Sequence, residues 1–208
     1  AMNDYPAPLD LTRVKVHPLA TRQSLSAIEK LLVDPDQAAP DCAPAIRAVL
    51  DEAVQRIGQA RRRGASVILM YGAHLIKNGG HRIVNRLVER GWITHLATNG
   101  AGTIHDWELA FLGRTEESVR KHVAAGCFGT WDETGRYIHL ALLAGALRSE
   151  GYGQSLGRFI VEDGLSLPTA DDLQRAIREA PMDPLTPARA ELLQVIVGHR
   201  LDPGRLEV

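Results

Sequence analysis

Residues 66–72, Ser-Val-Ile-Leu-Met-Tyr-Gly, form a continuous apolar stretch between a serine and a glycine, and this stretch decides the predicted fold. Its length and its β-branched residues are typical of a strand that is buried on both faces of a parallel sheet. A helix with apolar residues at helical spacing follows and stops at Gly91, and residues 92–97 then predict a second strand. The order strand, loop, helix, strand, loop, helix predicts a right-handed βαβ unit over residues 64–112.

Helices are predicted on both sides of this unit. Apolar residues at helical spacing predict a helix over residues 45–63, which ends at an arginine run and Gly64. Start signals and apolar periodicity predict further helices downstream, over residues 115–125, 132–147, 151–161, 170–180 and 186–198. The predicted fold is therefore α/β, with a Rossmann-like parallel sheet flanked by helices.

The predicted organisation is an N-terminal arm, residues 1–44, followed by one α/β domain, residues 45–208, whose helical region covers residues 115–198. The arm contains a short alternating piece at residues 11–16, which indicates an irregular arm or an edge strand. Two parallel strands do not make a stable sheet. We therefore expect further strands from the arm and from weakly patterned segments of the chain, from residues beyond Val208 or from another chain.

Bulk properties exclude several classes of function. A formal net charge of −1 over 208 residues gives no electrostatic reason to expect a nucleic-acid partner. No apolar run approaches the roughly 20 residues that span a membrane, and no signal-peptide pattern is present. Cys42 and Cys127 form no C-x-x-C pair, which is typical of reduced thiols. We expect a cytoplasmic protein with no membrane or nucleic-acid partner.

Two glycine-containing loops follow the predicted strands, at residues 72–80 and 98–103. Ligands bind at the carboxyl ends of the strands in an open parallel sheet, and the helix N-termini there favour phosphate. Lys77 and Asn99 add a positive charge and an amide to these loops. Neither loop is a G-x-G-x-x-G or a P-loop. Three interpretations stay open: a nucleotide or dinucleotide site, another small-molecule site, and purely structural turns.

His105 and Asp106 are the candidate catalytic residues, because they follow the second loop at the predicted start of a helix. Histidine titrates near neutral pH and suits a general acid or base, and Asp106 could orient it. The structural alternative is an aspartate in a first helical turn. Trp107 is predicted to be a core residue rather than a stacking platform.

The histidines do not predict a metal site. None of them forms H-x-x-x-H or H-E-x-x-H, although His74 and His105 both follow predicted strands and could converge. His95 lies inside a predicted strand and is interpreted as a core histidine. His139 lies inside a predicted helix and is interpreted as structural or as part of an interface.

Around the two loops the sequence resembles the deoxyhypusine synthases. Residues 71–79, Tyr-Gly-Ala-His-Leu-Ile-Lys-Asn-Gly, are similar to the family stretch G-Y-T-S-N-L-I-S-S-G. Residues 98–106, Thr-Asn-Gly-Ala-Gly-Thr-Ile-His-Asp, are similar to T-T-A-G-G-V-E-E-D. The resemblance spans residues 45–145 and implies a Rossmann-like fold and a homo-oligomer, either a dimer or a tetramer. It also implies an NAD-dependent transfer of an alkylamine group from a small-molecule substrate.

The resemblance assigns site residues one by one. His105 falls where the family has a glutamate that touches both NAD and the polyamine. The positions that would line the NAD site are Ala73, His74, Leu75, Ile76, Lys77, Asn99, Gly100 and Ala101.

The chain also departs from the family pattern. Ile104 and His105 replace a pair of glutamates that suits a polycation, and the family's catalytic-lysine segment is not found before Val208. The resemblance is thus to a divergent bacterial branch that lacks the C-terminal segment, with an unknown substrate. Two alternatives remain open. One is a cofactor-independent hydrolase or transferase in which Lys77 holds an anionic substrate, and the other is a non-catalytic binding or assembly module.

Overall fold

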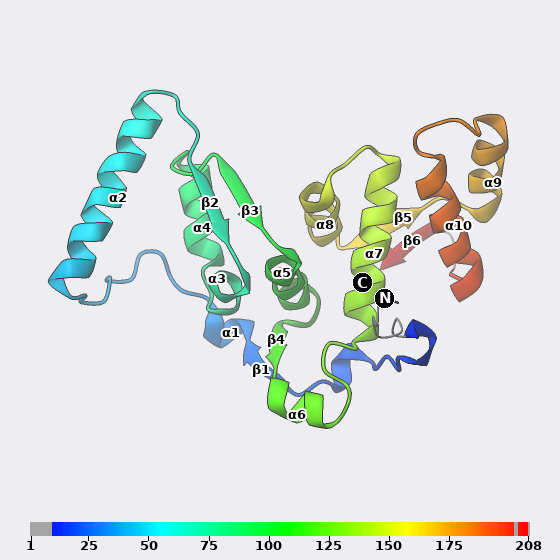
Figure 1. Cartoon of the computed structure of the whole chain (residues 1–208), viewed down its shortest axis with the longest axis horizontal. Coiled ribbons are helices and arrows are strands. Elements are labelled where there is room, and N and C mark those ends of the chain that lie inside the picture. Colours follow the sequence, from blue (N-terminus) through cyan, green and yellow to red (C-terminus); the bar gives the residue numbers. More distant parts are fainter. Residues whose placement is uncertain (1–9, 202–203, 208) are drawn as a thin grey trace, which may run out of the picture.

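The computed structural model describes residues 10–201 and the backbone of residues 204–207. The fold is mixed α/β, 58% helical, with three small two-stranded sheets among these residues. Two groups of elements lie on either side of helix α5, Gly100–Leu112 (Figure 1). We call the group with α2, β2, β3 and α4 the sheet lobe and the group from α7 to α10 the helical lobe.

The sheet lobe contains the predicted parallel pair. Strand β2, Ile68–Tyr71, pairs in parallel with β3, His95–Thr98. Helix α4, His81–Glu89, connects them as predicted and ends before Gly91, whose φ of 69° suits glycine. The second strand begins three residues later than predicted, because residues 92–94 follow the end of α4 in turn and extended conformations.

Two boundaries around the predicted loops also differ. The first loop is largely a short helix, α3, Ala73–Lys77. Helix α5 begins at Gly100 rather than near His105, since the Asn99 side chain caps it by accepting a hydrogen bond from the Gly102 amide at 3.3 Å. His105 therefore lies in the second turn of α5.

The prediction that the first strand is buried on both faces is wrong. Ile68 is 56% exposed and Met70 is 78% exposed, because β2 and β3 form a two-stranded sheet with no further strand beside them among the described residues. A Rossmann-like parallel sheet is therefore not confirmed.

Helix α2, Pro44–Arg62, confirms the predicted helix to within a residue at each end. Proline at its first position and Arg61 and Arg62 in its last turn account for its ends. None of its residues is buried. In Figure 1 it stands at the outer edge of the sheet lobe and slopes away from β2.

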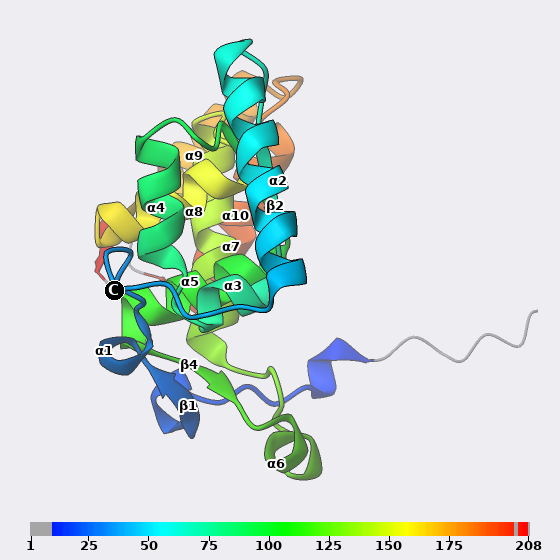
Figure 2. The same cartoon turned by 90° about the vertical axis from the view of Figure 1, so that its left-hand side faces the viewer.

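An antiparallel pair lies below α5 (Figures 1 and 2), and one of its strands comes from the N-terminal arm, from which a strand was expected. Strand β1, Ser24–Ala27, pairs with β4, Arg114–Glu117. The predicted helix start at residue 115 is wrong because residues 114–117 are extended, and Ser118 caps α6, Val119–Ala124, instead. The alternating piece at residues 11–16 contains a 3-10 turn, Leu11–Arg13. Strand β1 is flanked by a second 3-10 turn, Leu19–Thr21, and by helix α1, Ile28–Leu31.

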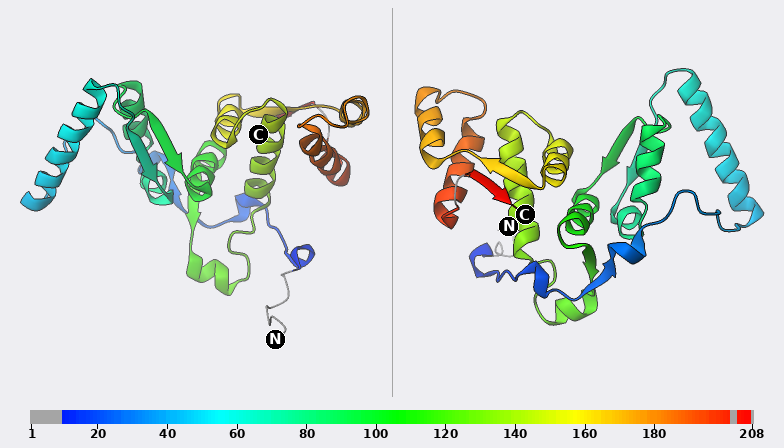
Figure 3. Two further views of the ribbon diagram at one scale, coloured as in Figure 1. Left: turned by 45° about the horizontal axis from the view of Figure 1, so that its top comes forward. Right: turned by 180° about the vertical axis from the view of Figure 1, so that it is seen from behind.

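The helical lobe contains the four predicted helices, α7, Asp132–Leu147, α8, Tyr152–Val161, α9, Ala170–Glu179, and α10, Thr186–His199. An antiparallel pair of β5, Gly164–Leu167, and β6, Gly204–Glu207, was not predicted (Figure 3). Trp107 of α5 joins this core as predicted, with its ring stacked on Phe111 at 4.8 Å. The core consists of Leu19, Trp107, Trp131, Ile138, Leu140, Ala141, Ala144, Leu156, Phe159, Leu165, Leu167, Leu173, Leu192 and Ile196.

Candidate functional site

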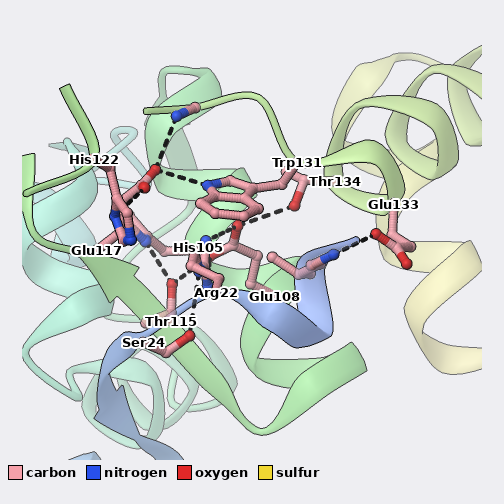
Figure 4. Close-up of polar contacts among 12 residues, drawn as sticks. Arg22, Ser24, His105, Glu108, Thr115, Glu117, His122, Trp131, Glu133 and Thr134 are labelled. Atoms are coloured by element: carbon pink, nitrogen blue, oxygen red, sulfur yellow. Dashed lines mark hydrogen bonds and ion pairs between the residues drawn. The ribbon is translucent and has the colours of Figure 1, made fainter. Parts of the chain in front are cut away.

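A cavity of about 300 Å³ lies where the N-terminal segment, α3, α5, β4 and the start of α7 meet, and we call it the His105 cavity. Five separate stretches of chain contribute to it, and Figure 4 shows most of its polar side chains. Its lining consists of Arg22, Lys77, Ile104, His105, Glu108, Glu116, Glu117, Val119, Phe128, Gly129, Trp131 and Thr134.

A buried ion pair forms the base of the cavity. Arg22 donates two hydrogen bonds to Glu108, at 2.7 and 2.9 Å, and the two side chains are only 3% and 2% exposed. Thr134 also donates to Glu108 Oε1 at 3.1 Å. A bidentate arginine–carboxylate pair with further donors satisfies both charges, which makes burial tolerable. Glu108 is thus an ionised acceptor that fixes its neighbours.

His105 is connected to Glu108 through Thr115 (Figure 4). The Thr115 hydroxyl donates to Glu108 Oε2 at 2.7 Å, and His105 Nδ1 lies 2.7 Å from the same hydroxyl oxygen. A hydroxyl has one proton, and a carboxylate only accepts, so Thr115 must accept from Nδ1–H. The hydrogen bonds therefore select the tautomer in which the His105 Nε2 carries the free lone pair.

Burial lowers the pKa of His105 below its ordinary value, and this effect outweighs the opposite influence of Glu108. The imidazole is therefore neutral at physiological pH. A neutral imidazole with a defined tautomer can accept a proton at Nε2, as a general base requires.

Lys77 lies in the cavity but is not a free cation. Its Nζ is 2.8 Å from Glu116 Oε1, and Ser26 donates to Glu116 Oε2 at 2.6 Å. Burial raises the pKa of Glu116, but the hydrogen bonds from Lys77 and Ser26 overcome this effect and hold it below its ordinary value. The backbone of Glu116 has a φ of 66°, a conformation that costs a non-glycine residue about 1–2 kcal/mol.

A second polar cluster closes the cavity wall. Glu117 Oε1 accepts hydrogen bonds from the Trp131 indole at 2.9 Å and from the Gly129 amide at 3.0 Å. Its other oxygen lies 2.7 Å from Nδ1 of His122, a buried side chain whose ring meets the Trp131 ring edge-on. These contacts hold the segment between α6 and α7 against β4.

The structure does not bring Asp106 to His105. The Asp106 carboxylate is half-exposed and lies 3.4 Å from Nε2 of His81, outside the lining of the His105 cavity. Adjacent helical residues point about 100° apart, so neighbours in sequence rarely share a site. Thr115 and Glu108 occupy the orienting position that the sequence assigned to Asp106.

The residues predicted to line a cofactor site lie at the carboxyl edge of β2 and β3. Residues 73–77 form α3, and residues 99–101 are the cap and first turn of α5, which packs beside α3. Ile76 is buried and His74 is exposed, so they do not converge on one surface. Gly102 has a packing role, because a Cβ there would lie 2.4 Å from Thr98 Oγ1.

The remaining histidines do not form a metal site. His95 is exposed, so its interpretation as a core histidine is wrong. His139 is exposed and lies 2.6 Å from the Gly135 carbonyl oxygen through Nδ1. Within residues 10–201 and 204–207, no group of three or more His, Cys, Asp or Glu side chains could hold a metal ion. In the same part of the chain no helix is long and apolar enough to cross a membrane.

Comparisons with protein families, with curated proteins and with solved structures found no match to this chain. The site is therefore interpreted from its own geometry.

Sequence reasoning found His105 and Lys77 but missed Arg22, Glu108, Thr115, Glu117 and His122. One signal was present, because Glu108 lies three residues after His105 and so shares its helix face. Thr115 and Arg22 gave no such signal, since only the pairing of β1 with β4 brings them to α5.

Proposed function

We propose that this chain is an enzyme in which His105 Nε2 accepts a proton from a small-molecule substrate bound in the His105 cavity. The observation that carries the proposal is the hydrogen-bonded series from His105 through Thr115 to Glu108, itself held by Arg22. A buried carboxylate that fixes a histidine tautomer is a recurrent arrangement in proton transfer. A purely structural histidine needs no such orientation toward a cavity.

The charges of the cavity indicate the substrate class. The lining holds two cations, Arg22 and Lys77, and three carboxylates, Glu108, Glu116 and Glu117, so it carries one carboxylate in excess when His105 is neutral. An excess carboxylate favours a neutral or positively charged substrate over an anion. An amine-bearing substrate fits this balance and agrees with the alkylamine that the resemblance to deoxyhypusine synthases implies. The pairing of Lys77 with Glu116 argues against the alternative that Lys77 holds an anion.

NAD is the second part of the proposal. It is supported by the meeting of α3 and the start of α5 at one edge of the parallel pair, directly beside the His105 cavity. Gly100 has open space where a Cβ would stand, so a ligand can approach the first turn of α5 closely. The chemistry that NAD would supply when bound is the acceptance of a hydride from the carbon next to the amine nitrogen. His105 would take the proton from the amine nitrogen, and Asn99 and Gly100 would position the dinucleotide in a Rossmann-like assembly.

The test combines binding and turnover with the purified full chain. Calorimetric titration with NAD⁺ and with putrescine, a simple diamine, measures each affinity, and NADH absorbance reports amine oxidation. We expect His105→Gln to lower turnover by about 100-fold or more, while both affinities change little. His139→Gln, an exposed histidine on α7, is the matched control.

The outcomes separate the alternatives. Diamine binding without NAD⁺ binding would support the cavity and favour the cofactor-independent hydrolase or transferase. Equal turnover in wild type and His105→Gln would contradict the proton-transfer role. A folded chain that binds neither probe would leave the non-catalytic binding or assembly module as the better explanation.

A further inference from the structure

Helix α2 exposes an apolar stripe. Its side chains recur at helical spacing, and none of them is buried, with Val49 and Val54 65% and 68% exposed. A nineteen-residue helix with no buried residue lacks the packing that normally stabilises an amphipathic helix in water. We call this surface the α2 stripe, and it consists of Ile46, Val49, Leu50, Ala53, Val54 and Ile57.

The α2 stripe borders an apolar cavity of about 360 Å³ between α2 and the sheet. Its lining residues are aliphatic apart from Trp92, and the nearby side chains of Met70 and Leu96 are exposed. The residues of the lining are Val54, Ile57, Val67, Ile68, Leu69, Leu87, Trp92 and Ile93. A continuous apolar surface of this kind marks an interaction site in a folded protein.

We infer that a second copy of this chain covers this surface, with the two α2 helices packed antiparallel across a twofold axis. The order of residues in the α2 stripe supports self-association. The positions of the stripe are symmetric about a point between Asp51 and Glu52, so Ile46 would face Ile57, Val49 would face Val54 and the larger Leu50 would face the smaller Ala53. An isologous interface requires this self-complementarity.

Charge complementarity supports the same direction. Asp41 precedes α2, and Arg61 and Arg62 end it. In the antiparallel arrangement Asp41 of each copy stands opposite Arg62 of the other, and opposite ends of the two helix dipoles meet. A parallel arrangement would bring the two arginine runs together. Asp51 and Glu52 lie on the flanks of the helix, away from the α2 stripe.

The inferred dimer also explains the open cavity. Each α2 would lie across the mouth of the partner's cavity, so one interface covers the α2 stripe and the cavity in both copies. This inference does not rest on the reaction at His105, because none of the residues of the α2 stripe lines the His105 cavity.

Sedimentation equilibrium of the full chain, up to about 100 µM, tests the inference. We expect a dimer in the wild type. Leu50→Glu places a charge at the centre of the interface in both copies and should raise the dimer Kd about 100-fold or more. The single chain should still fold, with an unchanged circular dichroism spectrum, because Leu50 is 48% exposed. Gln55→Glu adds the same charge on the opposite face of α2 and should leave the Kd unchanged.

A wild-type chain that stays monomeric over this range would overturn the inference. Equal dimer Kd values for Leu50→Glu and Gln55→Glu would also overturn it, because such a dimer would use another surface. The alignment of the two α2 helices is tested with the variant Leu50→Cys/Ala53→Cys, in which Cys42→Ser and Cys127→Ser remove the native thiols. Rapid oxidative cross-linking between chains is expected for antiparallel α2 helices, and its absence in a dimer would also count against the arrangement.

Discussion

The helical lobe and the sheet lobe differ in how completely they bury their apolar side chains. In the helical lobe α7, α8 and α10 enclose side chains such as Leu140, Phe159 and Leu192, which are almost completely buried. In the sheet lobe Ile76, Val84 and Ile93 are buried, but Ile68 and Met70 face outward. Helices bury a stripe against neighbours close in sequence, whereas a strand has two faces and needs partners on both. This difference is the basis of the inferred dimer, in which a second copy would cover the exposed apolar side chains of the sheet lobe.

Helix α5 connects the two lobes and carries the site. One face places Trp107 in the helical core, and another presents His105 and Glu108 to the cavity, together with Lys77 of the sheet lobe. A site at such a junction depends on the relative position of both lobes. The difference between the lobes is therefore tested by making the same kind of substitution at a buried residue and at an exposed residue of α2.

The largest expected effect is at the Arg22–Glu108 pair. Glu108→Ala leaves the buried Arg22 guanidinium without its counter-charge and should lower the free energy of unfolding by about 3–5 kcal/mol. Urea unfolding followed by circular dichroism measures it. The matched control is Glu52→Ala, which removes an exposed carboxylate paired with Arg56 on α2 and should cost less than about 1 kcal/mol. Similar losses in both variants would mean that the junction is no more tightly packed than the surface of α2.

A pair of leucines gives the next effect. Leu140→Ala creates a cavity in the helical core and should lower the free energy of unfolding by about 2–5 kcal/mol. Leu50→Ala, on α2, should change it by less than about 0.5 kcal/mol when measured in dilute monomer. The same urea experiment compares them. A large loss for Leu50→Ala at low protein concentration would show that α2 already packs against its own chain and that the two lobes do not differ as described.

The same contrast explains how much of the fold could be predicted. Helices α2, α4, α7, α9 and α10 were predicted closely, because apolar periodicity, proline at the first turn and glycine after the last turn are local signals. A strand from the arm was expected, but the position of β1 and its pairing with β4 were not, and strands β4, β5 and β6 were missed. Each has four residues, and β4 consists of Arg, Thr, Glu and Glu, so only its pairing with β1 makes it extended.

The site was predictable only in part for a related reason. Histidine and lysine after a glycine loop attract attention from their chemistry, and Lys77 and His105 do meet in the cavity. The choice of Asp106 rested on adjacency in sequence, which the helical rotation of α5 does not preserve. Arg22 reaches Glu108 across 86 residues, and no local pattern indicates a contact of that separation. The buried network is a property of the tertiary fold.

The smallest effect concerns the protonation of His105, a partly buried histidine at the junction of the two lobes. Burial lowers the pKa of His105 in the folded chain, while in the unfolded chain it returns to about 6.5. Above that pH both states hold a neutral imidazole. As the pH falls below it, the unfolded state binds a proton first, so the free energy of unfolding decreases until the folded pKa is passed.

The urea midpoint of wild type should therefore fall more steeply between about pH 7 and about pH 5 than that of His105→Gln. Equal slopes in wild type and His105→Gln would mean that the Thr115–Glu108 network accommodates the imidazolium as well as the neutral ring, and would remove the reason to assign a free base to Nε2.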